Sequence, residues 1–386
     1  MTDVRPADAA AAGAAPPPRS VLVVVTRRIG DVLLATPLIR SLKLAWPRTE
    51  VDALVFRGTE GVLAANPDLR RIHTVPERPG RLWHLRFLLR IARRYDIALS
   101  LQTGDRPSLY AFVAGRRSVG LQLSTGKGAM KRFLLDRWVA FDNVNTHTVC
   151  MHLSLADAIG IPRCGEVVAS WSTGEEQQVD ELPGAGGPHP LAVLHTYPKF
   201  RYKMWRPEAW LEVARWMADR GFRLALTGSS DADELAYVSA LARSMPAGTL
   251  NAAGKLTLGA SACLVSRARV FVGLDTAMTH VAAALGVPTA ALYGPTNPVK
   301  WGPWPRGQPP DVNPWRRCGS QHILNVALVQ GPGACVPCHL EGCERHLQSG
   351  ADCLDQLTVR QVIAAIELLL DQGTAPLPQA APRHSR

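Results

Sequence analysis

The chain has 386 residues, of which 47% are hydrophobic and 19% charged, with 32 glycines and 30 prolines. This composition is typical of a globular protein of about two domains, and it excludes a coiled coil or a wholly disordered chain. The chain has 43 Lys and Arg residues and 32 Asp and Glu residues, which gives a net charge of +11. This charge favours anionic partners such as nucleotides, phosphorylated glycans, anionic lipid surfaces or nucleic acids.

The two ends of the chain lack the pattern of folded elements. Residues 1–19 have no basic start followed by an apolar stretch, so they are predicted to be a disordered tail rather than an export signal. Residues 373–386 are predicted to be a second tail. The longest apolar runs are far shorter than the roughly 18 residues that span a bilayer, so any membrane contact is predicted to be peripheral. Eight cysteines in such a chain favour reduced thiols or metal ligands over disulfides.

The first half alternates between short apolar runs and helical spacing. Strands are predicted at 21–25, 51–56 and 97–102, and helices at 31–46 and 147–159. This alternation predicts a doubly wound α/β domain over 20–183.

A Pro- and Gly-rich stretch, PGAGGPHP at 183–190, predicts a linker, and a second α/β domain follows over 190–357. Two such domains are expected to face each other across a cleft at the carboxyl ends of their strands, where open α/β sheets bind ligands. The second half is predicted to form strands at 191–195, 222–228, 270–273 and 289–294 and helices at 207–220, 231–244, 258–266 and 276–285.

The sequence RIGD at 28–31 connects the first strand to the first helix. Its glycine permits close backbone approach, and Asp31 follows at the start of the helix. Asp31 is either a general base that faces the cleft or an ordinary helix N-cap.

A basic loop follows the first strand of the second domain, in HTYPKFRYKMWRPEAW at 195–210. It contains Lys199, Arg201, Lys203 and Arg206 within eight residues. These cations would suit a diphosphate, because lysine and arginine both neutralise phosphate oxygens. The alternative is a solvated basic loop.

The segment 270–298 carries the strongest signal, with a strand, a tight turn, a helix, another strand and a glycine turn. Thr276 and Ala277 open the helix, whose free N–H groups and dipole form an anion site. Asp275, beside that site, either caps the helix or binds sugar hydroxyls. His280 lies on the face of Thr276 and is either part of the site or a core histidine.

Two further clusters have open interpretations. Asp231, Asp233 and Glu234 follow a strand in LTGSSDADEL at 226–235, and Asp231 either binds a ribose or caps the next helix. Four cysteines spaced C-x2-C-x4-C-x9-C are either structural metal ligands or free thiols: Cys335, Cys338, Cys343 and Cys353.

A stretch of 14 residues at 81–94, RLWHLRFLLRIARR, is predicted to be an amphipathic basic helix. Its arginines are set at near-helical spacing against Leu85, Leu88 and Leu89. Either it is a packed helix with a solvated arginine face, or it contacts a phosphorylated lipid acceptor.

Four motifs together resemble glycosyltransferase family 9, the ADP-heptose:lipopolysaccharide heptosyltransferases. The motifs are RRIGDVLLATPLIRSLK at 27–43, KMWRPEAW at 203–210, LTGSSDADE at 226–234 and VGLDTAMTHVAAALGVPTAALYGPTNPVKWGP at 272–303. The resemblance implies the GT-B architecture, α/β with two Rossmann-like doubly wound domains facing across a cleft. The first domain would bind the acceptor and the second the nucleotide sugar, and a final helix at 358–372 would pack back across the domains.

The resemblance also implies an activity. The enzyme would transfer L-glycero-D-manno-heptose from ADP-heptose to the lipopolysaccharide inner core with inversion and without a catalytic cofactor. It would be cytoplasmic and peripheral at the inner membrane of a Gram-negative bacterium, with an anionic lipid A–Kdo or heptosylated inner-core acceptor. The C-terminal cysteines resemble a segment of members that carry iron, so a structural Zn or Fe is an open expectation there.

Particular residues match the family motifs. Asp31 would be the base, and Lys203 would act in catalysis at the donor phosphates. The remaining predicted donor-binding residues are Thr196, Asp231, Asp275, Thr276, Ala277 and His280.

Other functions are compatible with the same residues. One is a glycosyltransferase of the same fold that uses another nucleotide sugar or a protein acceptor. Another is a non-catalytic protein that binds glycans or nucleotides. The net charge also raises nucleic-acid binding, but the sequence has no helix-turn-helix, zinc-finger or aromatic-basic RNA motif, so nucleic acid is not an expected partner.

Overall fold

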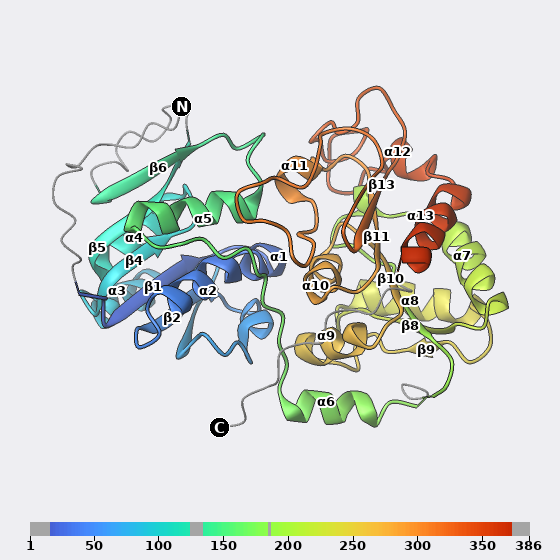
Figure 1. Ribbon diagram of the computed structural model, residues 1–386, viewed down its shortest axis with the longest axis horizontal. Helices are drawn as coiled ribbons and strands as arrows, with labels where there is room; N and C mark the ends of the chain where they lie inside the picture. Colours follow the sequence, from blue (N-terminus) through green and yellow to red (C-terminus); the bar gives the residue numbers. More distant parts are fainter. Residues whose placement is uncertain (1–15, 124–133, 184–186, 373–386) are drawn as a thin grey trace.

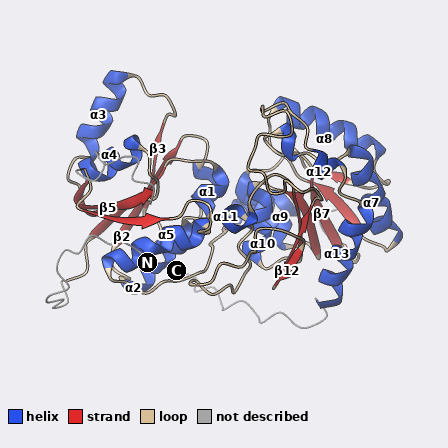
Figure 2. Cartoon of the chain, turned by 90° about the horizontal axis from the view of Figure 1, so that it is seen from above, coloured by secondary structure: helices blue, strands red, loops and turns tan. Residues whose placement is uncertain are grey.

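The computed structural model describes residues 16–123, 134–183 and 187–372. Residues 1–15 and 373–386 of the two predicted tails, and residues 184–186 of the predicted linker, lie outside this part of the chain. The described residues form two α/β domains side by side (Figure 1). Each has a mainly parallel sheet with helices on both faces (Figure 2), which confirms the predicted fold class.

The first domain is built on a six-stranded parallel sheet of order β3-β2-β1-β4-β5-β6. Its central strand, VLVVV, is apolar and β-branched throughout and is buried on both faces, as is usual for the interior of a parallel sheet. Val23 of this strand lies opposite Ala53 and Leu99 of the two neighbouring strands. The strands are β1 (Ser20–Val25), β2 (Glu50–Phe56), β3 (Arg71–Val75), β4 (Tyr95–Ser100), β5 (Gly115–Leu123) and β6 (Arg137–Phe141). The helices are α1 (Ile29–Leu33), α2 (Thr36–Ala45), α3 (Arg81–Ile91), α4 (Asp105–Ala114) and α5 (Thr148–Ile159), with a 3-10 turn η1 (Glu60–Leu63). The next helix, α6 (Thr173–Asp180), belongs to the range predicted for the first domain but packs on α9 (Leu258–Ser266) of the second.

The second domain contains a seven-stranded sheet of order β12-β13-β11-β10-β7-β8-β9, parallel except for the β12–β13 pair. The strands are β7 (Leu191–His195), β8 (Arg223–Leu226), β9 (Leu250–Asn251), β10 (Val270–Leu274), β11 (Thr289–Tyr293), β12 (Gln321–Ile323) and β13 (Val326–Gln330). The helices are α7 (Pro207–Asp219), α8 (Ala232–Ser244), α9 (Leu258–Ser266), α10 (Ala277–Leu285), α11 (Pro298–Trp301), α12 (Asp352–Asp355) and α13 (Val359–Gln372), with a 3-10 turn η3 (Arg201–Lys203).

The helix predicted at 31–46 is two helices, α1 and α2. A continuous helix would need an N–H of Pro37 to bond the carbonyl of Leu33, and proline has none. The hydroxyl of Thr36 donates to that carbonyl instead, at 2.7 Å. The chain therefore restarts its helix at Thr36.

The final helix, α13, covers the second domain. Its main contacts are with strands β10, β11 and β13 and with helix α7. Val362, Ile366 and Leu369 are buried in the core of that domain. The structure therefore places this helix on the second domain, rather than across both domains as the resemblance implied.

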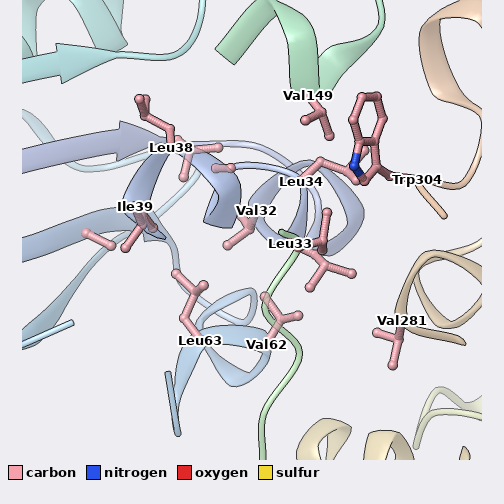
Figure 3. Close-up of a cluster of buried hydrophobic side chains, with 14 of the residues drawn as sticks. Val32, Leu33, Leu34, Leu38, Ile39, Val62, Leu63, Val149, Val281 and Trp304 are labelled. Carbon is pink, nitrogen blue, oxygen red and sulfur yellow. The ribbon is translucent and has the colours of Figure 1, made fainter. Parts of the chain in front are cut away.

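One apolar core continues from the first domain into the second. Figure 3 shows Leu33 of α1 and the following residue, Leu34, in the same cluster as Val281 of α10 and Trp304. Hydrogen bonds also cross this contact, with Thr148 Oγ1 donating to the carbonyl of Lys300 at 2.9 Å. The loop after β1 is therefore fixed against the second domain. Across the described ranges, none of the helices has the length and apolar character required to cross a membrane.

Candidate active site

Asp31 lies in the first turn of α1, the helix reached by a short loop from the carboxyl end of β1. Its side chain is 15% exposed, and Arg27 Nε is 3.7 Å from its Oδ1. Burial raises the pKa of Asp31, although the nearby cations Arg27, Arg28 and Lys300 oppose this effect. A carboxyl group with a raised pKa and one accessible edge is suited to accept a proton.

Lys203 and Asp275 form an ion pair in the second domain. Lys203 Nζ donates to Asp275 Oδ2 at 2.5 Å, and Thr296 Oγ1 donates to the same oxygen at 2.6 Å. Burial alone would raise the pKa of Asp275, but Lys203 and Thr296 lower it below its ordinary value, so the group is ionised. Lys199 is exposed, so the structure selects Lys203 as the lysine of this basic loop that reaches the strand ends.

The loop that carries Asp31 packs against both of these segments. A Cβ added to Gly30 would lie 3.6 Å from Cδ2 of His280 and 3.9 Å from Cα of Ala277. The guanidinium of Arg28 lies over the ring of Phe200, 4.4 Å from its centroid. The loop of the candidate base, in the first domain, therefore contacts both the basic loop and α10 of the second domain.

The first turn of α10 offers unused hydrogen-bonding groups. Thr276 is the N-cap but makes no capping bond through its side chain, and Ala277 is the first helical residue. Their free backbone N–H groups and the positive end of the helix dipole form an anion site.

Two buried side chains near this turn also have unpaired atoms. Nδ1 of His280 and Oγ1 of Thr196 find no hydrogen-bond partner among the described residues. Burial lowers the pKa of His280 to about 4, so its ring is neutral at pH 7. A bound ligand with donor and acceptor groups would satisfy both atoms.

Asp231 is the N-cap of helix α8. Its carboxylate caps α8 by accepting from the backbone N–H groups of Asp233 and Glu234. Glu234 is instead buried beneath the Gly228 turn, where Ser229 donates to it. The sequence reasoning grouped these acids but did not select Glu234, whose signal was its position on the buried face of the helix.

Lys300 is a further residue that the sequence analysis did not select. Its side chain is buried, and its Nζ lies 3.2 Å from Sδ of Met151 and over the ring of Phe141. Burial lowers the pKa of Lys300 to about 8. No local signal marks this lysine, because its position depends on the contact between the two domains.

The four cysteines of the expected metal site are all free thiols. In the described part of the chain, no three His, Cys, Asp or Glu side chains are grouped so that they could hold a metal ion. The structure therefore does not support a Zn or Fe site at these cysteines.

Two parallel α/β domains, with the candidate residues gathered where the domains meet, have the architecture of the GT-B fold. The structure is similar to that of Escherichia coli heptosyltransferase WaaC with ADP, at a TM-score of 0.68 and 21% identity, over 91% of this chain and 99% of that one.

Sequence comparisons narrow the class to a family. The model of glycosyltransferase family 9 (heptosyltransferase) matches residues 84–309. Lipopolysaccharide heptosyltransferase 1 of Pseudomonas aeruginosa is 31% identical, over 75% of this chain and 82% of the relative. Lipopolysaccharide heptosyltransferase 3 of Escherichia coli is 27% identical, over 71% of this chain and 83% of the relative. The chain belongs to glycosyltransferase family 9 and is an enzyme of glycosyl transfer.

Proposed function

We propose that this enzyme transfers L-glycero-D-manno-heptose from ADP-heptose to a sugar of the lipopolysaccharide inner core. The observation that carries the proposal is the approach of the Asp31 loop to α10, beside the Lys203–Asp275 pair. This contact brings the base Asp31 close to the phosphate-binding groups at Lys203 and to the sugar-binding carboxylate of Asp275. The names of the relatives, which are lipopolysaccharide heptosyltransferases, support the same donor and acceptor.

The transfer is a single displacement with inversion. An acceptor hydroxyl attacks the anomeric carbon from the face opposite the diphosphate, and its proton passes to the Asp31 carboxylate. A new C–O bond to the acceptor forms as the bond between the anomeric carbon and the β-phosphate oxygen breaks. ADP leaves with that electron pair.

The second domain binds the donor. Lys203 can keep its bond to Asp275 and donate a second one to a phosphate oxygen, because an ammonium has three donors. The N–H groups at Thr276 and Ala277 bind the diphosphate as its charge develops. Asp275 accepts from heptose hydroxyls, while Thr196 and His280 present the unpaired atoms described above.

The acceptor is an anionic lipid, either lipid A–Kdo or a heptosylated inner core, at the cytoplasmic face of the inner membrane. The net charge of +11 attracts such an acceptor. Contact with the membrane is peripheral.

The test is transfer from ADP-heptose to truncated lipid A–Kdo acceptors by the wild type and by Asp31→Asn. The variant should lose about 10²- to 10⁴-fold in turnover, the usual contribution of a general base, while ADP-heptose still binds. Asp219→Asn, at an exposed position on α7, is the matched control and should be as active as the wild type. Equal turnover of Asp31→Asn and the control would refute the role of Asp31.

A second measurement separates this function from the alternatives. A donor that binds only the folded state raises the unfolding temperature, so ADP-heptose should stabilise the protein more than UDP-sugars do. Stabilisation by UDP-sugars alone would refute the heptose donor. Donor binding with no transfer to any core acceptor would favour a protein acceptor or a binding role.

A further inference from the structure

Helix α3 of the first domain exposes a row of leucine side chains. Leu82, Leu85 and Leu89 are 61%, 55% and 69% exposed. Their spacing of three and four residues places them on one face of the helix. Trp83, at 36% exposure, stacks on Phe87 at the border between the exposed and buried faces of the helix. A contiguous apolar surface of this kind is a common mark of an interaction site.

The leucine row is not the face by which α3 packs on its own domain. Phe87 and Ile91 are buried in the core beneath the helix. The ring of Phe87 meets the ring of Tyr110 of α4 edge-on, with 5.7 Å between the ring centroids. The ring of His84 also meets the Tyr110 ring edge-on, at 5.4 Å between centroids. Since α3 is already anchored by this inner face, the leucine row remains available to a partner.

Arginines surround the row. The segment 78–94 contains six arginines and no Asp or Glu. Arg81, Arg86 and Arg90 are exposed on α3 itself. Of the ion pairs formed within the described ranges, none includes these three guanidinium groups. The surface is therefore both apolar and strongly cationic.

We propose that α3 docks on the surface of an anionic lipid bilayer. The leucine row enters the boundary between headgroups and acyl chains, Trp83 lies at the headgroup level, and the arginines bind lipid phosphates. Charge complementarity selects this occupant, and the apolar row distinguishes it from a purely polyanionic partner such as RNA. The inference deepens the proposed function, whose acceptor is a lipid, and its test by vesicle binding does not require transfer activity.

The position of α3 in the fold suits this role. The helix follows β3, and β3 runs parallel to β2, which runs parallel to β1. The start of α3 therefore lies toward the same edge of the sheet as Asp31, which follows β1. Figure 2 shows α3 on the outside of the first domain, away from the second domain. Docking through α3 would hold the first domain, which carries Asp31, on the bilayer surface.

The first experiment measures co-flotation of the full chain with vesicles of phosphatidylcholine, with and without phosphatidylglycerol. The wild type should bind the anionic vesicles, and high salt should weaken this binding. Changing all three leucines of the row to Ser should abolish binding. Changing Arg81, Arg86 and Arg90 to Gln should weaken it on the order of a hundredfold.

Matched controls carry the same substitutions elsewhere on the surface. Three other exposed leucines changed to Ser, and three other exposed arginines changed to Gln, should leave vesicle binding unchanged. The leucine controls are Leu44, Leu324 and Leu347, and the arginine controls are Arg316, Arg317 and Arg360.

A second experiment compares transfer to an acceptor embedded in vesicles with transfer to the same acceptor after deacylation. The α3 variants should lose activity only on the embedded acceptor, because the soluble acceptor needs no docking. If the wild type binds anionic vesicles but transfers heptose to neither acceptor, the proposed function fails and the docking surface stands.

Three results would overturn the docking proposal. One is vesicle binding by the α3 variants that equals that of their controls. Another is equal loss of transfer to the soluble acceptor, which would place α3 in the acceptor site itself. The third is a wild-type dimer, seen by sedimentation, that the leucine substitutions dissociate, because a second copy of the chain would then cover the row.

Discussion

Replacing Lys203 by Met tests the ion pair at the centre of the candidate site. The Lys203 and Asp275 side chains are 19% and 10% exposed, so the pair is mostly withdrawn from water. Removing one partner of a buried pair costs about 3–5 kcal/mol, because the other charge is left uncompensated. Asp275 keeps its hydrogen bond from Thr296, so we expect the lower end of this range, about 3 kcal/mol.

The cost should depend on pH. In the wild type, burial raises the pKa of Asp275, but Lys203 and Thr296 outweigh it and lower the pKa. The ionised carboxylate therefore stabilises the fold above the ordinary carboxyl pKa, and this contribution is lost as the pH falls through the lowered folded value. Without Lys203, burial is less opposed, so the folded state of the variant should take up a proton more readily. The destabilisation should then be largest near pH 7 and shrink toward about pH 4.

The assay is urea-induced unfolding followed by tryptophan fluorescence, for Lys203→Met, Asp275→Asn and the double variant. The double variant has no uncompensated charge, so it should be more stable than the sum of the single effects predicts, by at least about 2 kcal/mol. It should nevertheless be inactive, because the group that neutralises the donor phosphates is gone. Single effects that add to within about 0.5 kcal/mol would refute the coupling of these two residues.

Three other substitutions test the domain contact by the same unfolding assay. Burial lowers the pKa of Lys300 to about 8, so the buried ammonium reduces the free energy of unfolding at neutral pH. This penalty disappears as the pH rises from 8 toward the ordinary lysine pKa of 10.5. The stability of Lys300→Met relative to the wild type should therefore fall over that range, and a constant difference would contradict the assignment. Trp304 is 1% exposed and its Nε1 donates to the carbonyl of Gly165 at 2.8 Å, so Trp304→Ala should cost about 3–5 kcal/mol, and a cost below about 1 kcal/mol would contradict this packing. Gly30→Ala should change stability by less than about 1 kcal/mol, because the added methyl would meet His280 at an ordinary contact distance of 3.6 Å, and a larger loss would show that the loop packs more tightly.

The sequence predicted the elements best where burial is uniform. β1 and β10 are continuous apolar runs, and the structure places both inside parallel sheets. Strand β5 was not predicted, because it begins with Gly115 followed by two exposed arginines. Strand β6, at the edge of its sheet, buries only Val139 and Phe141 and was not predicted either.

Site residues could be predicted from the sequence where they follow a strand of a parallel sheet. Asp275 comes directly after a parallel strand of a sheet interior, and Asp31 lies in the helix that follows another, where general rules place ligands. Asp231 follows the same rule but caps its helix, so a strand-end acid alone cannot distinguish capping from binding. Lys300 could not be found at all, since its neighbours Met151 and Phe141 belong to the other domain.

Helix α3 shows why local patterning is insufficient even where the helix itself is predicted. Its sequence has apolar side chains on more than one face, so periodicity alone cannot say which face packs on the core. The prediction set Leu85, Leu88 and Leu89 against the arginines, whereas the structure buries Phe87 and Ile91 and leaves Leu85 and Leu89 exposed. Only the position of α4 decides this choice, because Tyr110 receives the Phe87 ring. The exposed leucines are therefore a product of tertiary packing, and it is their exposure, rather than the arginines alone, that favours a bilayer as the partner of this helix.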